Sequence, residues 1–339
     1  MILKKILITS LCVASVALVQ AQDIHFSQYF MSPVATAPGN TGNHNGDWRV
    51  FGNYRSQWNA ISNNLYTTPA IGGDYNFYVN KVDKISAGLY IVNDKSGGNL
   101  NVMKIMGSGA YHYALKKNYL HAGLQVGYVS KSIDKDAESY PNQFNEDKGL
   151  FDNTFALNKE TSLQNKLSFI DVNLGLGWHR TFGKITPYAN YSAFHVNAPN
   201  ESFVGGKNKL KMRNMLNLGV TIGINNMLTV HPSLLLTTQG KANELLLGAN
   251  LHYNLDNKLL SRKYVYVGQY IRYGVGNLAD ATFTTVGVSY KAVQVGLSYD
   301  VNVSQLKTIT ANRGAYELAF IYTGLSSRLT KKEIPCDRY

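Results

Sequence analysis

Residues 168–179 read S-F-I-D-V-N-L-G-L-G-W-H, and this stretch decides which fold the chain adopts. Every second residue from Ile170 to Trp178 is large and apolar, whereas every second residue from Asp171 to His179 is small or polar. Side chains alternate between the two faces of a β-strand, so the pattern predicts a strand with one apolar face. A helical period would scatter the polar residues around the apolar stripe. The apolar face needs cover, either from the core of a β-sandwich or from lipid.

The same kind of alternation recurs after Asp47. Fourteen stretches are predicted to be strands, and most exceed the roughly 5 or 6 residues usual in soluble proteins and reach the 9 to 11 of a tilted membrane strand. They are Trp48–Trp58, Tyr66–Val79, Lys84–Asn93, Asn101–Leu115, Tyr119–Ser132, Ser168–Phe182, Lys184–Phe194, Lys211–Ile224, Met227–Gln239, Ala242–Leu255, Arg262–Tyr273, Ala281–Tyr290, Ala292–Asn302 and Gly314–Gly324. Their length and number favour a membrane barrel over a sandwich.

The connections between these stretches alternate in length. Several are very short, such as Gly183 and Lys291, whereas the longest, Ile133–Leu167, is polar. Gly240-Lys241 and Asp256–Ser261 break the alternation. Short turns on one side and long loops on the other are typical of outer-membrane barrels. We therefore expect an all-β fold, a transmembrane antiparallel β-barrel of about 14 strands whose two ends face the periplasm.

The start of the chain predicts export. Basic residues precede an apolar run from Ile6 to Val19, and Val19 and Ala21 occupy the −3 and −1 positions of a signal peptidase site. We expect a signal peptide at residues 1–21, cleaved before Gln22. Mean hydropathy is −0.18, and no later apolar run is as long as the stretch of about 20 residues that a membrane-spanning helix needs. The expected location is therefore the outer membrane, which barrels span.

Three further parts complete the predicted organisation. Residues 22–46 are rich in turn-forming residues and are expected to form an irregular periplasmic or plug segment, with one short ordered piece at Phe26–Phe30. Residues 47–324 are expected to form the barrel, and residues 325–339 a periplasmic tail. The mature chain keeps a single cysteine, Cys336, so no internal disulfide is predicted.

Composition and motifs indicate no enzyme. The formal net charge is +12, but the basic residues are scattered and the chain is exported, which argues for lipid phosphates and against nucleic acid as their partner. No G-x-S-x-G or H-E-x-x-H motif is present, so we expect no catalytic site, no cofactor and no metal, with a lipid-modifying enzyme as a weaker alternative. Asp134–Asp136 and Asn145–Asp147 resemble loose calcium ligands, although a solvated loop is the favoured interpretation.

The predicted inner face of the barrel carries small and polar rows. These rows could line an open pore, or they could let an inserted segment such as residues 22–46 approach the wall closely. The charged residues that alternation places on this face include Arg49, Asp171 and Glu317. We expect the two acidic residues to pair with a basic residue such as Arg49 or Arg55.

The opening of the mature chain resembles a known family. Residues 22–30 read Q-D-I-H-F-S-Q-Y-F, Ser32-Pro33 follows, and residues 53–58 read N-Y-R-S-Q-W. Further matching motifs are G-A-Y-E-L at residues 314–318 and the ending P-C-D-R-Y at residues 335–339. Together they closely resemble the PorP/SprF family, the outer-membrane proteins of type IX secretion and gliding systems of Bacteroidetes. The resemblance spans nearly all of the mature chain.

The resemblance implies a function as well as a fold. Family members are non-enzymatic barrels, some of which help to secrete or anchor surface adhesins that carry a type IX C-terminal domain. It implies partners among such cargo and among periplasmic secretion, motor or peptidoglycan-binding components, with outer-membrane lipid around the barrel. An outer-membrane diffusion pore or substrate-specific transporter is the alternative. The motif residues that the resemblance implies as plug or partner contacts are Phe26, Ser27, Gln28, Tyr29, Pro33, Asn53, Tyr54, Arg55, Gln57 and Trp58.

Overall fold

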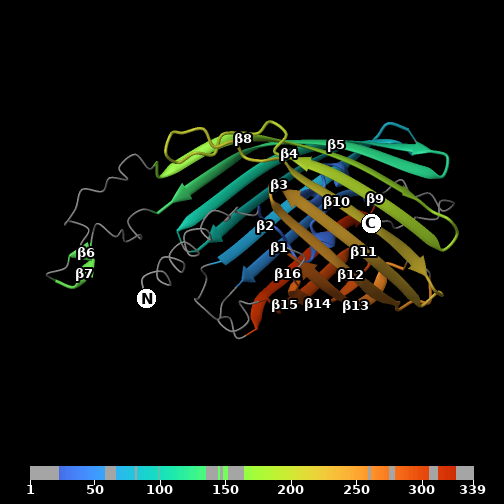
Figure 1. Cartoon of the computed structure of the whole chain (residues 1–339). Helices are drawn as coiled ribbons and strands as arrows, with labels where there is room; N and C mark the ends of the chain where they lie inside the picture. The colour runs from blue at the N-terminus through green and yellow to red at the C-terminus, as the bar shows by residue number, and fades with distance from the viewer. Residues whose placement is uncertain are drawn as a thin grey trace.

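The computed structural model describes residues 23–57, 66–80, 82–97, 99–134, 144–145, 148–151, 164–258, 261–274, 279–304 and 312–325. Fourteen antiparallel strands form a closed barrel, which confirms the predicted fold class (Figure 1). The predicted signal peptide, Trp58 and the tail beyond Leu325, with Cys336, lie outside the described residues.

The barrel strands follow one another around the wall in chain order. They are β1 (Gly46–Gln57), β2 (Tyr66–Tyr78), β3 (Lys84–Ser96), β4 (Leu100–Leu115), β5 (Asn118–Ile133), β8 (Lys166–Arg180), β9 (Ile185–Phe194), β10 (Arg213–Gly223), β11 (Leu228–Gln239), β12 (Ala242–Asn254), β13 (Lys263–Tyr273), β14 (Ala279–Tyr290), β15 (Val293–Asn302) and β16 (Arg313–Leu325). The first strand pairs with the last, so the ladder of backbone hydrogen bonds closes on itself.

A small hairpin interrupts the longest connection. It consists of β6 (Phe144–Asn145) and β7 (Leu150–Phe151), which pair only with each other. Figure 1 shows this hairpin beyond one end of the barrel. The connection between β5 and β8 therefore contributes no strand to the barrel wall in the part of the chain that the structure describes.

Strand β8 shows why the barrel forms. On its outer face, Ile170 is 53% exposed and Leu176 is 60% exposed, whereas Asp171 and Asn173 on the inner face are 1% and 2% exposed. An apolar outer row beside a buried polar row is the reverse of a soluble protein, and it matches a wall between lipid and a packed lumen. The predicted alternation of this strand is therefore confirmed.

A charge on the outer face of β8 tests the assignment of that face to lipid. Replacing Leu174, which is 45% exposed on this face, by arginine should lower the free energy of unfolding in lipid vesicles by about 2–4 kcal/mol. Leu150, which is 52% exposed in the β6–β7 hairpin, offers a matched control because it lies outside the barrel wall. Urea unfolding of both arginine variants measures the effect, and equal losses of stability would contradict a lipid-facing β8.

The two rims of the barrel differ in the length of their connections. At the short-connection edge, tight turns between β4 and β5, between β8 and β9 and between β14 and β15 use left-handed backbone at Lys116 (φ 57°), Gly183 (φ 58°) and Lys291 (φ 58°). The connections from β5 to β8 and from β9 to β10 lie at the opposite rim, the long-connection edge. The wall begins at Gly46 and ends at Leu325, both at the short-connection edge.

Within the ranges that the structure describes, the segment before β1 contains three short helical turns in place of the single ordered piece expected at Phe26–Phe30. They are η2 (Tyr29–Met31), α2 (Pro33–Thr36) and η3 (Pro38–Asn40). Two of them begin at a proline, whose fixed φ suits the first position of a helix and whose missing N–H is not needed there. Among the described residues, no helix is both long and apolar enough to cross a membrane.

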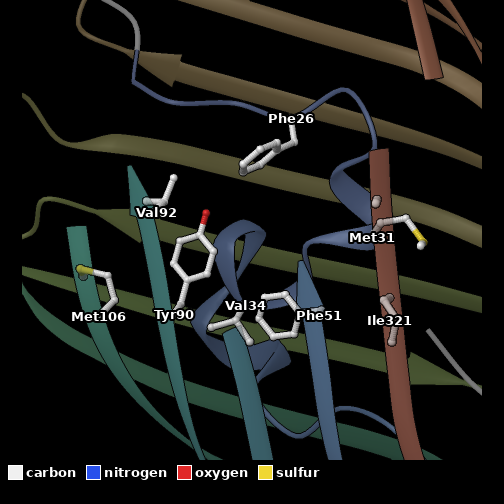
Figure 2. Packing of buried hydrophobic residues seen from close by; sticks show 9 residues of the cluster. Phe26, Met31, Val34, Phe51, Tyr90, Val92, Met106 and Ile321 are labelled. Carbon is white, nitrogen blue, oxygen red and sulfur yellow. The ribbon is translucent and has the colours of Figure 1, made fainter. Parts of the chain in front are cut away.

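We call residues 23–45 the lumen segment, because they pack against the inner face of the barrel. Figure 2 shows Phe26, Met31 and Val34 of this segment against side chains of the strands β1, β3, β4 and β16. The wall residues of this first cluster are Phe51, Tyr90, Val92, Met106, Ala319 and Ile321. A second cluster joins Tyr29 to the other side of the wall, through Phe194, Met215, Leu235, Leu246, Tyr270 and Phe283. Contacts on both sides place the segment inside the barrel.

Candidate functional site

The lumen segment runs along the barrel from one rim towards the other. Asp23 lies near the long-connection ends of β4 and β10, where it pairs with Lys104 and Arg213. Gly42 lies near the short-connection ends of β2 and β3, where its backbone binds Asp74 and Lys84. The segment therefore starts close to the long-connection edge, although both ends of the barrel wall lie at the other rim.

The middle of the segment is held by a buried carboxylate of β16. Glu317 is 1% exposed and accepts hydrogen bonds from the backbone N–H groups of Ser27 (2.9 Å) and Gln28 (3.0 Å). Arg55 lies directly opposite Glu317 on β1, with its Nη1 atom 3.5 Å from the carboxylate. The charge of Glu317 is therefore shared between a wall arginine and two N–H groups that the bend of the segment leaves without helical partners.

The hydroxyl of Ser27 completes this central cluster. It donates to the carboxylate of Asp300, at 2.8 and 2.9 Å, and accepts from Arg55 (2.6 Å) and Arg272 (2.8 Å). Both arginines also pair with Asp300, at 3.1 and 3.2 Å. Two guanidinium groups thus face the carboxylates of Asp300 and Glu317, and a buried set of charges is stable only when it is paired in this way.

A second group of charged residues, around Asp74, fixes the segment near the short-connection edge. Asp74 pairs with Arg49 at 2.5 Å and with His44 at 3.1 Å, and it accepts the backbone N–H of Gly42 at 2.7 Å. Lys84 donates to the carbonyl oxygens of Gly42 (2.6 Å) and His44 (2.8 Å). Arg49 and Asp74 are direct cross-strand partners on β1 and β2, so the wall alone sets this ion pair and the segment attaches to it.

Neutral hydrogen bonds attach the segment elsewhere. Tyr29 shares a hydrogen bond with Ser233 at 2.6 Å, and the Ser32 hydroxyl donates to Asn53 at 2.7 Å. Thr41 donates to Ser108 at 2.9 Å. The partners lie on β11, β1 and β4, so polar contacts to distant parts of the wall fix both the position and the rotation of the segment.

Two glycines in the wall make room for the turn η3. Gly123 and Gly175 are direct cross-strand partners on β5 and β8. A Cβ atom at Gly175 would lie 2.6 Å from the backbone nitrogen of Gly39 and 3.0 Å from Cδ of Pro38. A Cβ at Gly123 would meet the backbone of the same two residues. The paired glycines therefore form a hollow that matches Pro38 and Gly39, as expected where one backbone approaches another.

The structure brings most of the family-motif residues together in the lumen. Seven of them lie in the lumen segment or on the inner face of β1: Phe26, Ser27, Gln28, Tyr29, Pro33, Asn53 and Arg55. Gln57 lines a cavity at the long-connection edge. Tyr54 points the other way, is 38% exposed on the outer face and packs beside Tyr316, so it does not touch the segment.

The three charged residues predicted on the inner face all lie in the lumen. Their partners differ in part from the expected pairing of both acidic residues with a basic residue such as Arg49 or Arg55. Glu317 pairs with Arg55, as the sequence suggested. Arg49 pairs with Asp74, and Asp171 pairs with the imidazole of His195 at 2.9 Å. A histidine at a strand end carried no pairing signal in the sequence.

Sequence reasoning did not single out Asp23, Asp74, Arg272 or Asp300. Asp74, Arg272 and Asp300 lie in predicted strands, and alternation from a known inner-face residue would have placed them inward. The opposed pair of Gly123 and Gly175 was not identified either, because strand register is needed to see it.

Spaces remain on both sides of the lumen segment. A cavity of about 280 Å³, which we call the vestibule, lies at the long-connection edge beside Asp23, Arg55 and Lys131. A second cavity of about 100 Å³ lies between the segment and β9 to β13, beside Tyr29 and His231. Within the described ranges, no three His, Cys, Asp or Glu side chains come together as a metal site. Most of the calcium-like residues expected near Asp136 and Glu146 lie outside those ranges.

The histidines of the lumen segment predict that acid loosens it. Burial lowers the pKa of His25 and of His44 to about 4, whereas an unfolded histidine has a pKa of about 6.5. The released segment therefore binds more protons than the docked one, so the docked state loses stability as the pH falls from about 6.5 to 4. His195 opposes this trend, because its hydrogen bonds to Asp171 and Asp23 outweigh burial and raise its pKa.

Ion conductance across planar bilayers measures this effect. Current through the wild-type barrel should rise between neutral pH and about pH 4, and His44→Gln should reduce the pH dependence because one titrating group is lost. A current that stays constant over this range in the wild type would show that histidine protonation does not control docking.

Comparison with known proteins identifies the family of this chain and solved structures with a similar fold. The family model described as type IX secretion system membrane protein PorP/SprF matches residues 18–322. The CymD monoaromatic hydrocarbon channel is similar in structure, with a TM-score of 0.53 and 13% identity over 91% of this chain and 95% of that chain. The toluene transporter TodX of Pseudomonas putida has a TM-score of 0.50 and 8% identity, over 89% and 94% of the two chains. At such identities the likeness shows the fold alone. No curated protein matches the chain in sequence.

Proposed function

Because the chain belongs to the PorP/SprF family of type IX secretion system membrane proteins, we propose that it is a plugged outer-membrane barrel that helps to secrete or anchor surface proteins. Its cargo would be adhesins or other proteins that carry a type IX C-terminal domain. In this proposal the barrel is not an enzyme, and its work is to bind partners at its two rims. Secretion, motor or peptidoglycan-binding components would act on the periplasmic side.

The docked lumen segment carries this proposal. Charged anchors hold it at Asp23, Ser27 and Gly42, spread along its whole length. A diffusion pore needs a continuous water-filled lumen, whereas here the two clusters of buried side chains around Val34 and Tyr29 join the lumen segment to both sides of the wall. A barrel that is occupied in this way supports a role in protein binding and anchoring over one in bulk diffusion.

The two rims suit different partners. In outer-membrane barrels the short turns face the periplasm and the long loops face outward. We therefore assign the long-connection edge, with the vestibule, to secreted cargo. The short-connection edge, where Gly46 and Leu325 lie, would face the periplasmic components.

Affinity purification from native outer membranes in mild detergent, followed by mass spectrometry, tests the proposal. A large adhesin with a type IX C-terminal domain, or periplasmic secretion lipoproteins, should be recovered with the tagged barrel. Membranes that contain the untagged barrel provide the control. Chemical cross-linking then assigns each partner to a rim, and recovery of the barrel alone after cross-linking would contradict the anchoring role.

A substrate-specific transporter is the second candidate, because cavities of about 280 and 100 Å³ lie on either side of the lumen segment. Tyr29 lines the second cavity, and its hydrogen bond to Ser233 joins the lumen segment to β11. Movement of the segment could join the two spaces. A steady current through the wild-type barrel at neutral pH would favour this function, and a closed barrel would favour anchoring.

A further inference from the structure

Three basic side chains converge on Asp23 at the long-connection end of the lumen segment. Its Oδ1 atom lies 2.5 Å from Nζ of Lys104, and its Oδ2 atom lies 3.1 Å from Nε2 of His195 and 3.4 Å from Nη2 of Arg213. We call Lys104, His195 and Arg213 the basic pocket. They come from β4, from the residue after β9 and from β10, so the pocket is built by the wall and Asp23 is its guest.

The basic pocket has more positive charge than Asp23 neutralises. His195 already pairs with Asp171 of the wall, at 2.9 Å. Because both ring nitrogens of His195 face a carboxylate, Nδ1 that of Asp171 and Nε2 that of Asp23 at 3.1 Å, both donate and the imidazole carries a positive charge. Three cations therefore face the two carboxylates of Asp23 and Asp171, which leaves one positive charge in excess in this cluster. Buried charges without partners are costly, so a ligand with more negative charge than one aspartate would bind here favourably.

Arg213 also has hydrogen-bonding capacity that Asp23 does not use. The side chain is 93% buried, since its exposed fraction is 7%, and its Nε atom has no hydrogen-bond partner among the described residues. Its guanidinium carbon lies 4.3 Å from the ring centre of Phe194, which fixes its plane. A guanidinium held in one plane can bind a carboxylate through two parallel N–H groups, whereas the 3.4 Å contact to Asp23 is a single long one.

The pocket lies beside a space large enough for a peptide. The vestibule of about 280 Å³ is lined by Asp23, Lys104 and His195 together with Lys131 and Glu201. Lys131 and Glu201 pair with each other at 2.5 Å, so their charges are already balanced. Asp23, Lys104 and His195 also line an adjoining cavity of about 80 Å³ that Arg213 lines as well, so the vestibule and this smaller cavity meet at the basic pocket.

We propose that the basic pocket is a binding site for a carboxylate of an acidic peptide, and that Asp23 occupies it in the unliganded barrel. The incoming carboxylate replaces Asp23 and pairs with Lys104 and with the fork of Arg213. The proposal rests on the proposed function, because it assigns a recognition chemistry to the outer rim, where secreted cargo would arrive.

Displacement would free only the first part of the lumen segment. Asp23 lies at the beginning of the segment, whereas Ser27 and Gln28 keep their bonds to Glu317 and Gly42 keeps its bond to Asp74. The exchange replaces the carboxylate of Asp23 by one of the several carboxylates of an acidic peptide, whose further negative charge meets the excess positive charge, and it leaves the rest of the plug in place. Binding of a ligand is thereby signalled to the segment without opening the barrel.

Isothermal titration calorimetry of the full-length barrel in detergent tests the proposal. The probe is a synthetic hexapeptide of alternating aspartate and glycine with a free C-terminus, and its match is the asparagine–glycine peptide with an amidated C-terminus. The acidic peptide should bind and the neutral one should not. Asp23→Asn should strengthen binding roughly tenfold, because it removes a competitor that is present at a high effective concentration.

Variants of the pocket separate this site from general charge attraction. Arg213→Gln should abolish binding, and Arg213→Lys should weaken it, because lysine keeps the charge but loses the fork. Lys166→Gln removes a charge from the same rim outside the pocket and should leave affinity unchanged. Heat-modifiable migration on a gel confirms that each variant is folded.

Three results would overturn the proposal: equal binding of the neutral peptide, unchanged affinity in Asp23→Asn, or tighter binding of inorganic phosphate than of the acidic peptide. These titrations use the purified barrel and involve no secretion partner. A negative result of the titrations would therefore leave the proposed anchoring function untouched. A failed co-purification of partners would likewise not change the result of the titrations.

Discussion

Replacing Glu317 by glutamine should release the lumen segment and turn a closed barrel into a conducting one. The change removes the negative charge that faces Arg55 and weakens the acceptor for the backbone N–H groups of Ser27 and Gln28. Hydrogen bonds to a charged group contribute about 1.5–3 kcal/mol each, and both of these N–H bonds hold the lumen segment in place. At about 1.4 kcal/mol per factor of ten, docking should weaken more than a hundredfold.

Single-channel recording in planar bilayers measures the release directly. The glutamine variant should show steady open levels, whereas the wild type should remain closed at neutral pH. Asp94→Asn is the matched control, because it makes the same change of carboxylate to amide at a residue whose hydrogen bonds come from Thr68 and Ser96 of the wall. If both variants stay closed, the bond between Glu317 and the segment does not hold the plug.

Replacing Gly175 by valine should expel the turn η3 from its hollow. The new side chain would occupy space that Pro38 and Gly39 now fill, with backbone rather than flexible side chains on the other side. Overpacking of a close contact costs about 1–3 kcal/mol, and a rigid backbone cannot move aside to reduce it. The wall itself should stay intact, since valine suits a β-strand. We expect a shifted segment and an increased conductance.

Protease digestion and conductance together identify the cause. The lumen segment of the Gly175→Val barrel should be cut faster than that of the wild type, while the strands remain resistant. Gly109→Val on β4 is the control, because Gly109 faces outward and a Cβ there would come no closer than 3.8 Å to a neighbouring atom. Similar digestion of both valine variants would mean that the strand, and not the hollow, was damaged.

Much of the fold could be predicted from the sequence because lipid imposes a simple rule on a barrel wall. The apolar row from Ile170 to Trp178 must face outward, which places Asp171 inward without further information. Arg49 and Glu317 follow from the same alternation. Strand number and the alternating rims followed from the spacing of the turns.

The site could be predicted only in part, because its geometry depends on register and on a non-repetitive segment. The pairing of Glu317 with Arg55 requires β1 and β16 to meet in one register, although 262 residues separate them. The turns at Pro33 and Pro38 follow no periodic pattern, so their positions inside the lumen could not be derived from spacing. The partner of Asp171 proved to be His195, which lies outside any strand.

The anchors of the lumen segment also constrain the order in which the molecule is assembled. Ser27 binds Glu317 across 290 residues and Asp300 across 273 residues, so its binding site does not exist until the last two strands have joined the wall. Contacts so distant in sequence form late, because the intervening chain must be ordered first. Although the lumen segment precedes every strand of the wall in the sequence, it is therefore the last of these parts to reach its final place, and its docking marks the completed barrel.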